Sequence, residues 1–198
     1  MVLLQHRDMG DQNILRKVRS FKYLGCIIQD NGEIDEDVNH RIQAGWLKWR
    51  SASDFICDKK VPLKLKGKFY RTTIRPAILY GTEYWAAKGE HEHKLSVAEM
   101  KMLRWMSGHT RLDKIRNEDI RKRVGVAPII EKVVESRLRW FEHVGKKPTD
   151  HPVRRVDLME DGQEVRGRGR SKKTIHEVVK RDLNVNGLSV YMIHDRAQ

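Results

Sequence analysis

The chain has 198 residues, of which 34% are charged and 39% hydrophobic, and its 40 Lys and Arg against 27 Asp and Glu give a net charge of +13. This composition excludes an integral membrane protein, because no apolar run approaches the roughly 20 residues that a spanning helix needs. The two cysteines, Cys26 and Cys57, are far apart and form no CxxC motif, which argues against a disulfide scaffold or a zinc ribbon. We therefore expect an intracellular protein, nuclear or cytoplasmic, whose positive charge attracts polyanions.

A short β-hairpin is predicted near the N-terminus. The first 20 residues are polar and have no clear period, whereas the next 14 contain residues that favour strands, namely Phe21, Tyr23, Ile27 and Ile28. Asn31-Gly32 is typical of a tight turn whose two central residues have positive φ. The sequence therefore predicts a hairpin at about 21–34, which needs another element to pack on.

Two long amphipathic segments follow. Asp35, Glu36 and Asp37 form a favourable helix start. Behind them apolar or small residues recur every three or four positions, which predicts one buried face made of Val38, Ile42, Trp46, Trp49, Ser53 and Ile56. The segment 61–85 repeats this pattern with Leu63, Tyr70, Ile74, Ile78 and Trp85. Because Pro76 lies inside it, we expect this helix to break or kink near Arg75.

Three further helices are predicted before residue 146. One covers about 91–106, ends at Gly108, and has one face made of Leu95, Ala98, Met102, Trp105 and Met106. A short helix begins at Asn117. Another covers about 128–145, with inward positions at Ile130, Val133, Arg137, Trp140 or Phe141, and Val144.

The last quarter of the chain has a different character. Residues 146–173 are rich in glycine, proline and cations, which predicts a flexible basic arm rather than a packed element. A final helix at about 174–183 would bury Ile175, Val178, Val179 and Leu183. The predicted fold is thus mostly α, with an N-terminal segment at 1–34, a first helical bundle at 35–110, a second helical region at 111–145, and the arm with its terminal helix at 146–198.

The arm supplies the best candidates for nucleic-acid binding. The run RGRGRSKK at 166–173 contains five cations and no acid, and its glycines let the backbone follow a partner. We expect phosphate contacts, independent of nucleotide sequence, from Arg166, Arg168, Arg170, Lys172 and Lys173, assisted by Arg137, Arg139, Lys146 and Lys147. The alternatives for the same run are a solvated linker and a nuclear-localisation signal.

No catalytic residue, metal site or cofactor site is predicted in this chain. Nucleotidyl transfer needs carboxylates that hold two metal ions, and the sequence has no Asp-Asp pair, phosphate-binding loop, GxSxG or HExxH motif. His91 and His93 would lie two positions apart on a helix and point to different sides, so they cannot chelate one ion.

Several motifs, in order, resemble one family. FKYLGCII, DNGEIDEDVNHRI, RPAILYGTEYW, EMKMLRWMSGHTRLDKIRNEDIR, RLRWFEHV and RGRGRSKKT are similar to the C-terminal portion of reverse transcriptases from plant LINE-type retrotransposons, which lack long terminal repeats. The resemblance runs from about residue 21 to residue 196. It implies a thumb that grips template–primer duplex, preceded by a strand region that supports the primer end.

The resemblance also implies which residues are functional and which activity the matched region lacks. Phe21, Lys22, Tyr23, Leu24 and Gly25 match the primer-grip-like region. The family's catalytic palm, whose aspartates bind Mg²⁺, lies upstream of the matched region. The expected function is therefore binding of RNA and DNA by a truncated reverse transcriptase-like protein without polymerase activity. The alternative is an inert helical relic, or a host protein-interaction module with no nucleic-acid role.

Overall fold

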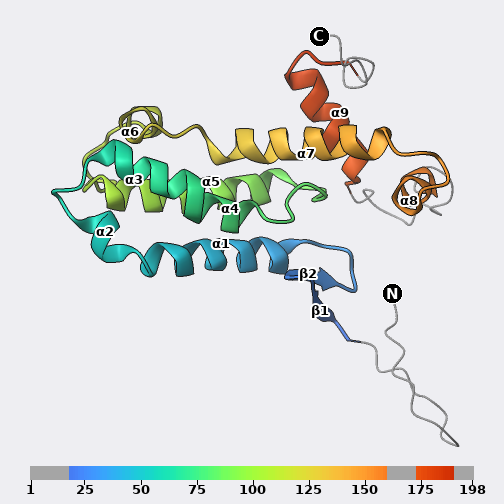
Figure 1. Ribbon diagram of the computed structural model, residues 1–198, viewed down its shortest axis with the longest axis horizontal. Helices are drawn as coiled ribbons and strands as arrows, with labels where there is room; N and C mark the ends of the chain where they lie inside the picture. Colours follow the sequence, from blue (N-terminus) through green and yellow to red (C-terminus); the bar gives the residue numbers. More distant parts are fainter. Residues whose placement is uncertain (1–17, 160–172, 190–198) are drawn as a thin grey trace, which may run out of the picture.

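The computed structural model describes residues 18–159 and 173–189. Helices predominate after one N-terminal hairpin, which confirms the predicted fold class. Helix α1 lies along one side of the bundle, α7 lies along the opposite side, and α3, α4 and α5 lie between them (Figure 1).

The hairpin pairs β1 (Ser20–Tyr23) with β2 (Cys26–Gln29) in antiparallel register. Its two turn residues, Leu24 and Gly25, have φ values of 46° and 87°. The prediction that Asn31-Gly32 forms this turn is wrong, because Gly32 instead lies between β2 and the first helix. By local preference alone, Asn-Gly is a better hairpin turn than Leu-Gly. The turn nevertheless forms at Leu24–Gly25, because side chains of the helical bundle hold these two residues in a conformation that leucine rarely adopts.

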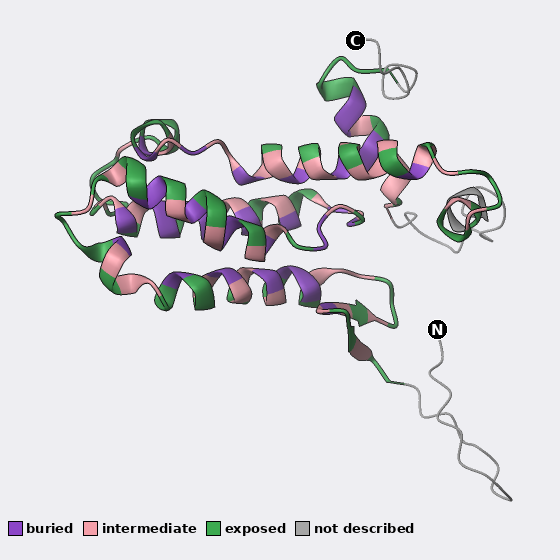
Figure 2. Cartoon of the chain, viewed as in Figure 1, coloured by how far each residue is buried: buried purple, intermediate pink, exposed green. Residues whose placement is uncertain are grey.

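The predicted apolar face of the first helical segment is confirmed. Helix α1 (Asp35–Arg50) is followed by the short helix α2 (Ser53–Cys57). Val38, Trp49 and Ile56 are buried, and their side of the two helices faces the bundle (Figure 2).

The second segment is continuous from residue 63 to residue 79 but changes its winding. It consists of α3 (Leu63–Phe69), the π-helical turn η1 (Tyr70–Ile74) and α4 (Arg75–Leu79). The predicted irregularity near Arg75 is thus a π turn rather than a break. The Arg75 N–H donates to Tyr70 O, five residues back, directly before Pro76, which has no N–H to donate.

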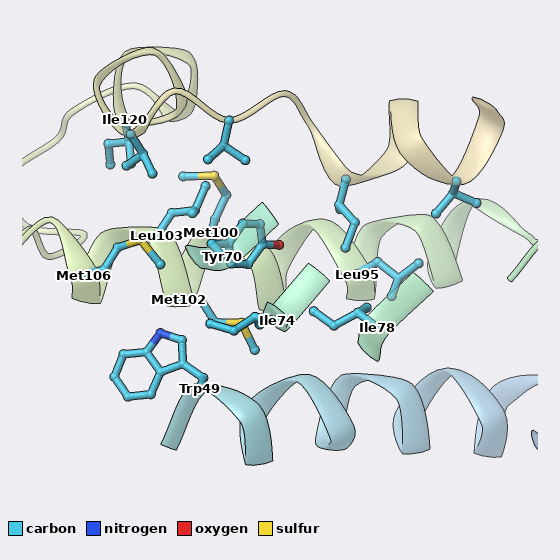
Figure 3. Packing of buried hydrophobic residues seen from close by; sticks show 14 of the residues in the cluster. Trp49, Tyr70, Ile74, Ile78, Leu95, Met100, Met102, Leu103, Met106 and Ile120 are labelled. Carbon is cyan, nitrogen blue, oxygen red and sulfur yellow. The ribbon is translucent and has the colours of Figure 1, made fainter. Parts of the chain in front are cut away.

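The π turn keeps one row of side chains on the core. Tyr70, Ile74 and Ile78 are four residues apart and all fully buried. In a regular α-helix each step of four residues turns about 40° past a full circle, so the row would drift off the core. A wider turn compensates for this drift, which explains why the three side chains point into the same cluster (Figure 3).

Three more helices complete the main core: α5 (Gly89–Met106), α6 (Asn117–Val124) and α7 (Ile129–Gly145). Leu95, Met102 and Met106 of α5 are buried as predicted, together with Met100 and Leu103 (Figure 3). Trp105, which was predicted to be buried, is 64% exposed. Its ring therefore lies on the surface of the bundle.

Helices α3 and α6 approach each other so closely that only glycine fits between them. A Cβ atom built on Gly67 would lie 2.0 Å from the carbonyl oxygen of Val124. We expect Gly67→Ala to lower the free energy of unfolding by about 1–3 kcal/mol, although alanine favours helices more than glycine does. Urea denaturation followed by circular dichroism measures the change. Gly89→Ala is the control, since no atom lies within 4 Å of its Cβ position; equal stability of the two variants would contradict the prediction.

The C-terminal region contains two more helices among the described residues. Helix α8 (Pro152–Met159) lies where a flexible arm was predicted, so that prediction is wrong for these eight residues. Proline favours irregular structure inside an element, but Pro152 is the first residue of α8, where a missing N–H is harmless. Helix α9 (Ile175–Val185) is capped by Thr174 and buries Val178, Val179 and Leu183 as expected.

Among the described residues, none of the helices has the length and apolarity to cross a bilayer.

Candidate nucleic-acid interface

The hairpin turn is held by two side chains from the helical bundle. Arg41 Nη2 donates to Gly25 O at 2.6 Å and lies 3.0 Å from Cys26 Sγ. The Tyr80 hydroxyl donates to Leu24 O at 3.1 Å, and the Arg41 guanidinium lies over the Tyr80 ring. These contacts stabilise a turn whose left-handed leucine costs about 1–2 kcal/mol by itself.

A buried carboxylate joins the hairpin to the bundle. Asp37 Oδ1 accepts a hydrogen bond from the Ile27 N–H at 2.9 Å, and Oδ2 accepts one from Trp85 Nε1 at 3.0 Å. Arg41 Nε lies 3.7 Å from Asp37 Oδ1. Strand β2, helix α1 and the segment before α5 therefore meet at Asp37, and the hairpin has a fixed position relative to the helices.

The predicted primer-grip-like residues form β1 and the turn of this fixed hairpin. Phe21 and Gly25 are half-buried, whereas Lys22, Tyr23 and Leu24 are exposed. Tyr23 is 47% exposed and Leu24 is 74% exposed. The tip thus presents one cation and two apolar side chains on a backbone that cannot easily move.

Arg137 does not lie where a phosphate contact requires it. Its side chain is fully buried and forms an ion pair with Asp182 of α9. Burial lowers the pKa of the Arg137 guanidinium, and the charges of Asp182 and Glu92 oppose this shift. The inward position predicted for Arg137 is confirmed, but its predicted role as a phosphate contact is not compatible with this packing.

The other described cations of the predicted set are more accessible. Arg139 pairs with Glu135 at 2.7 Å within α7, and Lys146, the residue that follows α7, pairs with Glu142. Such exposed pairs contribute little, so a phosphate can displace them. Lys147 and Lys173 are half-buried and form no ion pair with the residues that the structure describes. The remaining predicted cations lie outside the described residues: Arg166, Arg168, Arg170 and Lys172.

A buried glutamate that sequence reasoning missed organises the bundle. Glu99 is fully buried and accepts hydrogen bonds from the Tyr70 hydroxyl and Arg75 Nη2, both at 3.2 Å. It also accepts from Arg121 Nη2 and from the Ile129 N–H, both at 3.1 Å. Burial, with a smaller contribution from the charge of Glu99, raises the pKa of the Tyr70 phenol. Glu99 therefore connects η1, α4 and α5 to α6 and α7. Because its carboxylate is fully buried, a substrate cannot reach it.

Two carboxylates and a histidine lie close together where the starts of α1 and α5 meet, but their contacts do not favour a metal site. Potential ligand atoms of Asp35, Glu90 and His91 lie within 4.8 Å of one another. However, the Lys88 N–H donates to His91 Nδ1 at 3.2 Å, so the neutral ring carries its proton on Nε2, the atom that faces Asp35. Lys94 already lies 2.7 Å from the Asp35 carboxylate, and this hydrogen bond lowers the pKa of Asp35. The cluster is better described as a set of ion pairs.

Comparison with known proteins gives one informative similarity. A putative uncharacterized transposon-derived protein of Caenorhabditis elegans is 25% identical to this chain over 140 residues, which cover 67% of the chain and 49% of that protein. The chain is similar to a transposon-derived protein. It spans about half of that relative's length. No family model and no solved structure matches the chain.

Proposed function

We propose that this chain is the thumb and C-terminal region of a LINE-type reverse transcriptase of plant origin, and that it binds RNA and DNA through their phosphates. The similarity to a transposon-derived protein and the ordered set of motifs from residue 21 onward support this origin. In this proposal residues 1–34 contain the primer-grip-like hairpin, 35–110 form the thumb, and 111–145 with 146–198 form the region beyond it.

The observation that carries the proposal is the fixed hairpin with an exposed tip. A segment that supports a primer end has to hold its backbone still while its side chains remain accessible. Leu24 O and Gly25 O are both held by side chains of the bundle, and Lys22 and Tyr23 remain exposed. The helices that hold the hairpin are the ones assigned to the thumb.

The proposed role is binding without polymerisation. In the intact family, Mg²⁺-binding aspartates of the palm carry out nucleotide addition, and the present sequence contains no Asp-Asp pair. The chain's own cations would hold the sugar–phosphate backbone. Since phosphates are common to all sequences, affinity should depend on salt much more than on base sequence.

Binding of labelled RNA across a salt series tests this proposal. If about five phosphates are neutralised, log K should fall with log salt concentration with a slope of roughly −3.5 on single strands and −4.5 on duplex DNA. Fluorescence anisotropy measures the slope. Replacing Arg166, Arg168 and Arg170 with alanine should weaken binding to all sequences alike and reduce the slope by about two to three units.

The matched control removes three exposed lysines of the bundle, Lys48, Lys59 and Lys68, and so changes the net charge equally. This variant should lose little of the slope. The alternative, an inert relic or a protein-interaction module, predicts no salt-dependent binding by the wild type. Equal slopes for the two triple variants would remove the arm from the binding surface.

A further inference from the structure

A groove of about 950 Å³ lies between α1, α5 and the loop that leads to α6. This volume is at the upper end of the range for small-molecule sites, roughly 300–1,000 Å³. Among the described residues, its lining includes two tryptophans, four Lys or Arg side chains, two histidines and no carboxylate. The two tryptophans and the four cations are Trp46, Arg50, Lys101, Arg104, Trp105 and Arg111.

Trp105 is an exposed ring with a rigid support. It leaves 64% of its surface in solvent, so a ligand that covers the ring would gain from burying its apolar area. Its ring centroid lies 5.3 Å from that of Trp49 and 6.1 Å from that of Trp46. The two neighbouring rings fix its orientation, and a fixed aromatic ring open to solvent is a platform on which a nucleobase can stack.

The positive charge around this ring is only partly neutralised. Arg104 Nη1 donates to Thr110 O, and Arg104 Nη2 donates to Ile115 O and Asn117 Oδ1, which are all uncharged acceptors. Asp113 is the nearby acid: its carboxylate accepts hydrogen bonds from the Thr110 N–H and hydroxyl, and its charge also acts on Arg104 and His109. Arg104 therefore holds the loop that forms one wall of the groove, and Asp113 offsets part of its charge.

Among the residues that the structure describes, the three other basic side chains of the groove have no counter-ion. Arg50, Lys101 and Arg111 are exposed and form no ion pair within the described ranges 18–159 and 173–189. They come from three different segments, namely α1, α5 and the following loop. Cations from separate segments that converge beside an open aromatic ring match a nucleotide, which has an aromatic base and an anionic phosphate.

We propose that this groove binds an unpaired nucleotide of single-stranded RNA, with the base stacked on Trp105 and the flanking phosphates held by Arg50, Lys101 and Arg111. The inference rests on the proposed nucleic-acid function but differs from duplex gripping by a thumb. In a duplex the bases stack on one another, so Trp105 has no base to receive. The groove is therefore a site for a single strand rather than for a duplex.

Three labelled ligands of equal length separate base stacking from charge: a single-stranded oligoadenylate, an abasic ribose–phosphate oligomer and an RNA duplex. We expect Trp105→Leu to weaken oligoadenylate binding about 5-fold or more, with an unchanged salt slope. Its affinity for the abasic oligomer and for the duplex should equal that of the wild type. Trp105→Phe keeps an aromatic face and should retain most of the oligoadenylate affinity.

The charge component has its own variant. Replacing Arg50, Lys101 and Arg111 with glutamine should reduce the slope on oligoadenylate by about one to two units. The same change at Lys48, Lys59 and Lys68 removes equal charge outside the groove and should leave the slope near that of the wild type. Thermal melts by circular dichroism identify any variant that is unfolded. If Trp105→Leu is unfolded, the oligoadenylate affinity of Trp105→Phe tests the stacking instead, and a loss of affinity in folded Trp105→Phe would contradict it.

The outcomes distinguish the groove from the broader function. If Trp105→Leu binds all three ligands as the wild type does, or loses affinity for all three alike, the groove does not read a base and the inference is wrong. Salt-dependent binding by the wild type would then still support the proposed function. If the wild type binds none of the ligands and instead recruits an acidic peptide, both proposals fail.

Discussion

Glu99→Ala should lower the free energy of unfolding by about 3–5 kcal/mol, because it removes one partner of a buried ionic network and leaves the others behind. Arg75 and Arg121 would lose the carboxylate that they share, and the Ile129 N–H at the start of α7 would lose its acceptor. These groups come from three separate segments, so the loss should be global. Urea denaturation of the full chain, followed by circular dichroism, measures it.

Two controls separate the network from helix propensity and from charge. Glu118→Ala removes an exposed acid in the first turn of α6 and should change stability by less than about 1 kcal/mol. Glu99→Gln keeps an oxygen acceptor and nearly the same volume, so it should cost less than Glu99→Ala. A Glu99→Ala variant that is as stable as Glu118→Ala would contradict the assignment of Glu99 as the centre of the network.

Arg137→Ala is expected to release α9 from α7. Among the described residues, Asp182, which is 3% exposed, would keep Arg181 alone as a cationic partner. Breaking a buried pair by removing one partner costs about 3–5 kcal/mol. Helix α9 packs mainly on α7, so the effect should be local. Faster hydrogen exchange of the α9 amides, with little change in the α5 amides, is the expected result.

A double variant tests the same pair without a buried charge. Arg137→Met with Asp182→Leu replaces the ion pair by apolar side chains and should restore much of the protection of α9. It should also bind RNA with the wild-type salt slope, since neither side chain contacts solvent. Arg139→Ala, two positions along α7, removes an exposed cation and should leave α9 docked. If the double variant keeps α9 packed on α7 but has a reduced salt slope, Arg137 contacts phosphate after all.

Much of the fold follows from local periodicity. The faces of α1 and α9 were predicted correctly because their apolar residues recur every three or four positions, and one neighbouring surface covers each face. Pro76 correctly indicated an irregularity. The hairpin was predicted, but its turn was not, because the contacts of Arg41 and Tyr80 that favour Leu24–Gly25 come from residues far along the chain.

The remaining features depend on partners that no local pattern reveals. Arg137 occupies an inward position and is also a cation, and only Asp182, 45 residues later, decides between these two roles. Glu99 lies four residues after Leu95 on the buried face of α5, which is a weak signal of a buried acid. Trp105 lies at the edge of that face, and whether another segment covers an edge position is a tertiary property.

The π turn at Tyr70–Ile74 also constrains how this helix can change in evolution. A π turn is equivalent to one residue inserted into an α-helix. Deleting a residue there would restore regular winding but rotate everything before it by about 100° relative to everything after it. Lys66, which reaches Met106 O, and Arg75, which reaches Glu99, could not both keep their partners. The length of this helix is thus tied to contacts on both sides of the turn, so a one-residue gap would be tolerated less here than in any surface loop.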